Sequence, residues 1–164
     1  MSFLLRLAEA MASCSHLAGQ GAGNHDMGRS DNAMRYEDIT EKSVVALLQC
    51  FYAKVRGDPM LAPIYNEVLG ENWDIHIARI REFWCSALRV KPGYRRDMLA
   101  VHQQIGTLKP SLFPRWLARF REAVGECFAA APADVINDRA LKTARNLETA
   151  LFKRRVDAAE GRII

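Results

Sequence analysis

Two histidines, His76 and His102, are the side chains of the predicted domain best suited to hold a metal or a ligand. His76 shares a helical face with Ile80 and Phe83, so we expect it to point inward with them. His102 follows Met98 in a short helical segment beside a loop. A histidine on an apolar face is most often a satisfied core residue, so each alone predicts little. The pair raises the question of what two inward imidazoles would do together.

A haem site requires fewer protein ligands than a structural zinc site. Zinc in a structural site needs four protein ligands, and no cysteine pair or carboxylate cluster accompanies the two histidines in the sequence. In haem the porphyrin supplies four nitrogens to the iron, and the protein needs to supply only one axial histidine. The second histidine is then free to face a bound small molecule and to donate a hydrogen bond. The pair therefore favours haem.

Tyr52 and Trp116 carry two further polar groups that the helical pattern turns inward. Each lies on the apolar stripe of its predicted helix, and each has one hydrogen-bond donor, a phenolic O–H or an indole N–H. Buried donors of this kind need a partner. A backbone carbonyl would satisfy them, and so would a small ligand bound in the core.

Apolar residues recur at helical spacing from Asp38 almost to the C-terminus, and no segment of the domain alternates as a strand would. The predicted fold class is therefore all-α, with five or six helices. A capping box over residues 38–41 opens the first helix, which Gly57 ends, and Asp58-Pro59 opens the second. The second helix is predicted to run to Gly70, and a third from residue 72 or 74 to the break at Pro92-Gly93. Three more are predicted over 95–104, over 111–130 with a stop at Pro132, and from an N-cap at Asp134 to about Val156.

The first 34 residues differ from the rest in composition. Residues 13–30 are rich in Gly, Ser, Asn and His and hold few large apolar side chains, so they bury too little surface to offset their ordering entropy. We expect residues 1–34 to form a flexible N-terminal extension with a short helix over 3–11, and Met34 is an alternative start. The domain is expected over 35–158, followed by a C-terminal tail at 159–164.

Charge and cysteine content narrow the setting. The net charge is only +4, and the chain has no run of five like charges, so no nucleic-acid or membrane partner is expected. The four cysteines form no C-x-x-C pair, which is typical of a reducing compartment. No apolar run approaches the roughly 18–20 residues that cross a bilayer. We therefore expect a cytoplasmic protein.

Five segments, in their order and spacing, resemble the group III truncated haemoglobins of bacteria. The resemblance covers roughly residues 36–152, nearly the whole predicted domain. The segments are FYAKVR at 51–56, LAPIYN at 61–66, WDIHIARI at 73–80 with FW at 83–84, MLAVH at 98–102, and FPRWLARF at 113–120.

The resemblance implies a truncated globin fold, in which helices pack as a two-over-two sandwich around haem b. By its position in the motifs, His102 matches the proximal histidine that ligates the iron. His76, Tyr52 and Trp116 match the polar residues of the distal pocket, on the other side of the haem. The residues expected at the apolar walls and in contact with the cofactor are Phe51, Ile80, Phe83, Met98 and Phe113.

Two positions are less well matched by the family pattern. Tyr65 stands where the family more often has phenylalanine, which leaves open which distal residue is the main hydrogen-bond donor. The haem propionates need cationic partners near the pocket mouth. Arg95, with its neighbour Arg96, is the candidate because it lies just before the proximal segment.

The function implied is reversible binding of dioxygen, nitric oxide or carbon monoxide. Three donors that converge on one ligand would slow its release, which argues against simple oxygen transport and favours oxygen, nitric oxide or peroxide chemistry, or sensing. An enzyme of this kind would act like a nitric oxide dioxygenase or a peroxidase and would need a reductase partner, which the sequence does not identify.

Two other functions stay open at this point. The domain could be a globin-like interaction or sensor module that no longer holds haem, although the intact His102 argues against this reading. It could also be a basic helical nucleic-acid binder. The arginines that such a binder would use are Arg79, Arg81, Arg115, Arg119 and Arg121. Several of these five lie opposite the apolar stripes of their helices, as ordinary exposed residues do.

Overall fold

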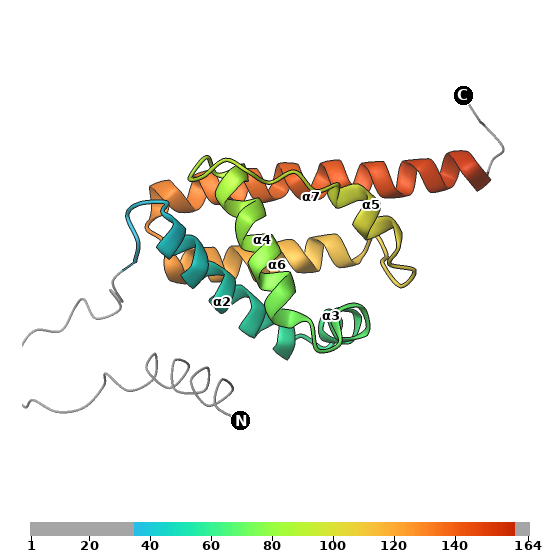
Figure 1. The fold of residues 1–164 in the computed structure, drawn as a ribbon, viewed down its shortest axis with the longest axis horizontal. Coiled ribbons are helices and arrows are strands. Elements are labelled where there is room, and N and C mark those ends of the chain that lie inside the picture. Colours follow the sequence, from blue (N-terminus) through green and yellow to red (C-terminus); the bar gives the residue numbers. More distant parts are fainter. Residues whose placement is uncertain (1–34, 160–164) are drawn as a thin grey trace, which may run out of the picture. The chain divides into compact units, whose positions relative to one another are not determined.

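The computed structural model describes residues 35–159, which form six helices joined by loops and turns (Figure 1). Within this range the β-structure is limited to one isolated bridge between Tyr36 and Phe128, so the all-α prediction is confirmed. The extension predicted over 1–34, with its short helix, lies outside the described residues, as do residues 160–164. The helices are α2 (Glu41–Gly57), α3 (Ala62–Leu69), α4 (Trp73–Ala87), α5 (Met98–Gln103), α6 (Leu112–Cys127) and α7 (Ala130–Ala159).

Four of the helices form two crossed pairs. Helices α6 and α7 run antiparallel beside each other, and α2 packs on α6 while α4 packs on α2 (Figure 1). The shorter helices complete the arrangement, with α3 against α2 and α5 against α7. This is the two-over-two sandwich that the family resemblance implies.

A column of aromatic rings joins the two pairs. Phe120 of α6 stacks on Trp84 of α4, with ring centroids 4.7 Å apart and planes at 19°. Phe51 of α2 meets Phe120 edge-on at 5.2 Å, and Trp116 stacks on the same ring at 5.0 Å. Phe51, Trp84 and Phe120 are almost completely buried. Aromatic pairs in such geometries add to the free energy of burial, so this column fixes α2, α4 and α6 relative to one another.

The first two helices begin later than the sequence suggests. Thr40, rather than Asp38, is the N-cap of α2, because Thr40 and Ser43 form the capping box through reciprocal side-chain to backbone hydrogen bonds. The second helix begins at Ala62 rather than at Pro59. The Asp58 carboxylate accepts the backbone N–H groups of residues 60 and 61 and holds this stretch as a turn.

The boundary between the last two helices also lies earlier in the chain than predicted. Helix α6 ends at Cys127, and Pro132 lies in the first turn of α7, where a proline costs no backbone hydrogen bond. The break occurs earlier because Phe128 is extended and lies beside Tyr36. The Tyr36 N–H donates to the Cys127 carbonyl at 2.8 Å, and the Tyr36 carbonyl accepts the N–H of Ala129 at 3.1 Å.

Asp58 is the principal buried charge of the domain. Its side chain is inaccessible to solvent and pairs with Arg115 Nε at 2.6 Å and Arg119 Nε at 2.9 Å. Burial alone would raise the pKa of Asp58, but the hydrogen bonds from both arginines outweigh this and hold the pKa well below its usual range. Two of the five arginines considered for nucleic-acid binding are thus used to neutralise one carboxylate.

Replacing Asp58 by Ala removes these pairs and the turn that precedes α3. We expect a loss of about 3 kcal/mol in the free energy of unfolding at pH 7, as for other broken buried ion pairs, measured by urea denaturation. Because the pKa of Asp58 is depressed, its contribution is present above about pH 4 and is lost as the pH falls further. The gap between wild type and variant should therefore narrow under acid conditions.

The matched control is Asp138→Ala. This carboxylate pairs with Lys142 one turn away, and both side chains are largely exposed, so the cost should stay within about 0.5 kcal/mol. An equal cost for the two variants would contradict the role assigned to Asp58.

Candidate functional site

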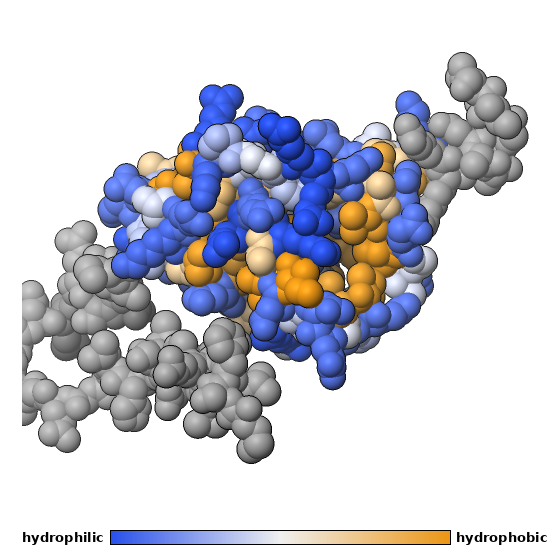
Figure 2. Space-filling view, viewed as in Figure 1, coloured by the Kyte–Doolittle hydropathy of each residue, from blue (hydrophilic) through white to orange (hydrophobic). Residues whose placement is uncertain are grey.

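A pocket opens between α4 and α5 and reaches α2, α6 and α7. It has about 820 Å³ of unfilled space when the open solvent at its mouth is counted. In Figure 2 hydrophobic residues gather around the N-terminal end of α4 and between α4 and α5. The pocket is lined by Tyr52, Leu61, Ile64, Tyr65, His76, Ile80, Phe83, Trp84, Met98, His102, Leu108, Leu112, Phe113, Trp116, Thr143, Ala144 and Leu147.

Most of the residues selected from the sequence meet in this pocket, although they come from four helices. The eight that line it are Tyr52 of α2, His76, Ile80 and Phe83 of α4, Met98 and His102 of α5, and Phe113 and Trp116 of α6.

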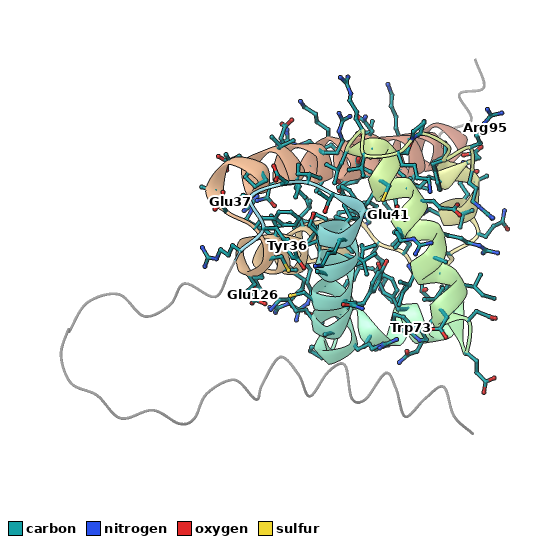
Figure 3. All side chains as sticks on the ribbon, turned by 60° about the vertical axis from the view of Figure 1, so that its left-hand side comes forward. Tyr36, Glu37, Glu41, Trp73, Arg95 and Glu126 are labelled. Atoms are coloured by element: carbon teal, nitrogen blue, oxygen red, sulfur yellow. The ribbon has the colours of Figure 1, made fainter. Side chains whose placement is uncertain are left out.

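Two selected residues do not line the pocket. Phe51 is buried one layer behind it, where its ring meets Trp116 edge-on at 5.2 Å. Arg95 is exposed on the loop before α5, and Figure 3 shows its side chain at the periphery of the domain.

Sequence reasoning missed the wall that α7 provides through Thr143, Ala144 and Leu147. The apolar spacing of this helix predicted an inward face but not the surface that the face would meet. Leu108 was missed for a different reason, because it lies in a loop, where no periodicity applies. The remaining lining residues that were not selected are Leu61, Ile64, Tyr65, Trp84 and Leu112.

The His102 ring is oriented by its own helix. Asp97 caps α5 by accepting the N–H of Ala100 at 3.0 Å, which starts the helix later than the predicted Arg95. One turn on, His102 Nδ1 lies 2.7 Å from the carbonyl oxygen of Met98. Since a carbonyl only accepts, Nδ1 carries the proton and donates it. Nε2 is left with a free lone pair, as in a metal-binding histidine.

Burial lowers the pKa of His102, while the bond to the Met98 carbonyl opposes this in part. The ring is therefore neutral at neutral pH, which is the form that binds a metal.

Tyr52 and His76 form the polar pair on the α2 and α4 side of the pocket. Tyr52 Oη and His76 Nε2 are 2.7 Å apart. Burial, with a smaller contribution from Tyr65, raises the pKa of Tyr52 well above its usual value. Burial lowers the pKa of His76 to about 4, helped by repulsion from His102 when that ring is protonated and from the Arg79 guanidinium. Both groups are thus neutral at pH 7, and only one of their two protons is used in the bond between them.

Trp116 and Tyr65 form a second polar pair. The Trp116 indole N–H donates to the Tyr65 hydroxyl oxygen at 3.1 Å. Burial raises the pKa of Tyr65 to about 12, although the bond from Trp116 acts in the opposite direction. The Trp116 donor is therefore already used within the protein.

The arrangement fits haem. One neutral imidazole has a free nitrogen, the walls are largely apolar, and a second imidazole and three polar aromatic groups also line the space. Within residues 35–159, no group of three or more His, Cys, Asp or Glu side chains is placed to hold a metal ion by itself. A macrocycle that brings four of its own nitrogens needs no such group.

Comparison with known proteins agrees with this reading. No family model matches the chain. The chain is 32% identical over 123 residues to the group 3 truncated hemoglobin ctb of Campylobacter jejuni, and the match covers 73% of this chain and 97% of that protein. This chain belongs to the group III truncated haemoglobins. The crystal structure of a group III truncated hemoglobin from Campylobacter jejuni superposes with a TM-score of 0.69 at 31% identity, over 74% of this chain and 98% of the other.

As a truncated haemoglobin, the protein is a globin, and membership implies a haem cofactor and small gaseous ligands. None of the helices in the described part of the chain is both long and apolar enough to cross a membrane.

The environment of His76 gives a pH prediction. We expect its ring to be half-protonated at about pH 4 in the haem-free protein, because the buried pocket disfavours the charged form. An unfolded histidine titrates near 6.5, so His76 contributes stability above this pH that is lost as the pH falls toward 4. The measurement is an NMR titration of the histidine rings, with His76→Gln used for assignment. A midpoint near 6.5 would show a hydrated ring and contradict the pair with Tyr52.

Proposed function

We propose that this truncated haemoglobin holds haem b through His102 Nε2 and binds dioxygen, nitric oxide or carbon monoxide on the side of Tyr52 and His76. The observation that carries the proposal is the 2.7 Å hydrogen bond from His102 Nδ1 to the Met98 carbonyl. It fixes both the tautomer and the direction of a ring that lines the pocket. A histidine that only filled the core would have no need of a free Nε2.

The haem iron, when bound, supplies the position at which a diatomic ligand attaches. The chain supplies the surroundings. Ile80, Phe83 and Phe113 exclude water from the ligand, which strengthens any hydrogen bond made there. The pair of Tyr52 and His76 has one proton to offer, either the Tyr52 O–H or the N–H of the other His76 nitrogen, according to which member donates within the pair.

Polar donors at the ligand make release slow, which suits ligand chemistry better than bulk oxygen transport. We propose turnover of oxygen, nitric oxide or peroxide, as in a nitric oxide dioxygenase or a peroxidase, with a reductase as electron donor. The three cysteines of residues 35–159 are free thiols, which supports a reducing, cytoplasmic setting.

Arg95 and Arg96 are the proposed partners of the haem propionates. Both are exposed on the loop before α5, close in sequence to the proximal residues Met98 and His102. Exposed guanidinium groups at a pocket mouth can pair with carboxylates without a large desolvation cost.

The direct test of the proposal is an absorption spectrum of the purified protein, reconstituted with haemin, before and after reduction under carbon monoxide. We expect a sharp Soret band that shifts with carbon monoxide and is lost in His102→Ala. His76→Ala is the control, since it removes the other imidazole and should keep the band. A protein that takes up no haemin, or a band that survives in His102→Ala, would refute the proposal.

Removing the Tyr52 hydroxyl should speed ligand release. In Tyr52→Phe we expect dioxygen to dissociate at least about fivefold faster, the effect of losing about one hydrogen bond, measured by stopped flow. Tyr94→Phe is the control, because Tyr94 packs on Phe83 but does not line the pocket. An unchanged dissociation rate in Tyr52→Phe would remove Tyr52 from the ligand site.

A further inference from the structure

The hydrogen bond between Trp116 and Tyr65 changes which group can reach a ligand. An indole N–H can donate but not accept, so the Tyr65 oxygen is the acceptor in the 3.1 Å contact. Trp116 has only one donor, and this contact uses it. Among the described residues the Tyr65 O–H finds no acceptor, so its proton stays available.

Packing fixes the Tyr65 ring on several sides. It stacks on Trp73 with centroids 5.8 Å apart and planes at 18°. It also meets Tyr52 edge-on at 6.0 Å and His76 at 5.9 Å. Trp73 is itself covered by the Arg56 guanidinium, 4.4 Å from its ring centroid, and Figure 3 shows Trp73 at the start of α4. The Tyr65 hydroxyl is therefore held in place at the pocket wall.

We propose that Tyr65 donates a hydrogen bond to the bound ligand and that Trp116 acts through Tyr65 as a positioning residue. This inference rests on the proposed function, because it needs a ligand in the same pocket. It departs from the expectation that Trp116 itself donates to the ligand. Tyr65 replaces a phenylalanine in the family pattern, so this chain brings one more hydroxyl to the site.

The arrangement has a consequence for ligand preference. A hydroxyl that accepts one hydrogen bond becomes a better donor in the next, since bonds in a chain polarise one another. If haem is bound as proposed, dioxygen on the ferrous iron would carry partial negative charge and accept such a bond well, whereas carbon monoxide would carry little. Tyr65 should therefore slow the release of dioxygen more than that of carbon monoxide.

The decisive comparison is between Trp116→Phe and the double variant Trp116→Phe with Tyr65→Phe. These two proteins differ by one hydroxyl group, and no indole N–H is left to take its place. The Tyr65 ring keeps its packing against Tyr52, Trp73 and His76 when Trp116 is replaced. We therefore expect dioxygen to dissociate at least about fivefold faster from the double variant, with less than a twofold change for carbon monoxide. A dioxygen rate within twofold in the two proteins would overturn the inference. Trp116→Leu provides a second background if the first loses haem.

The hydrogen bond can also be tested without haem. In the haem-free protein, Tyr65→Phe should move the Trp116 indole N–H resonance upfield, because the proton loses its acceptor. The indole proton of Trp84 is the internal control, because its ring packs on Phe83 and Phe120 rather than on Tyr65. An unmoved Trp116 resonance would overturn the inference. The Soret band of each variant distinguishes failure of the proposed function from failure of this inference. If wild type takes up no haem, the proposed function fails. If the variants take up haem but their dioxygen dissociation rates do not depend on Tyr65, only this inference is refuted.

Discussion

The hydrogen bond from His102 to the Met98 carbonyl sets which imidazole nitrogen is free to bind a metal. A histidine has two nitrogens, and a metal needs one of them deprotonated and turned toward it. In α5 the bond one turn back along the helix satisfies Nδ1 at 2.7 Å and leaves Nε2 free. The Asp97 cap starts the helix at the residue that makes this geometry available. In the proposed site, this six-residue helix supplies the one protein ligand that haem would need, because the porphyrin would bring four nitrogens of its own.

Elsewhere in the pocket, polar side chains are already hydrogen-bonded to one another. Tyr52 bonds to His76 and Trp116 bonds to Tyr65, so each buried donor or acceptor is already partly satisfied in the apolar pocket. Each pair keeps one proton that a ligand can accept. Such pairing lowers the cost of burying four polar groups, and it means that the number of donor residues overstates the number of hydrogen bonds available to a ligand.

Periodicity predicted the helices because it reports which face of a helix turns inward. His76 and His102 stood out as polar residues on such faces. The resemblance to the truncated haemoglobins added the apolar pocket residues Ile80, Phe83, Met98 and Phe113. Periodicity does not report which surfaces meet, so the wall formed by Thr143 and Leu147 was missed. The bond between Trp116 and Tyr65 joins residues 51 positions apart and has no local signal. Pro132 gave a wrong helix boundary because a proline can follow the end of one helix or lie in the first turn of the next.

A crystal structure of the reduced protein with haem and carbon monoxide would show directly whether this pocket binds haem through His102. We expect iron bound by His102 Nε2, with Nδ1 still donating to the Met98 carbonyl, and the ligand on the side of Tyr52, His76 and Tyr65. Iron bound by His76, or by both histidines, or haem seated outside this pocket would contradict it.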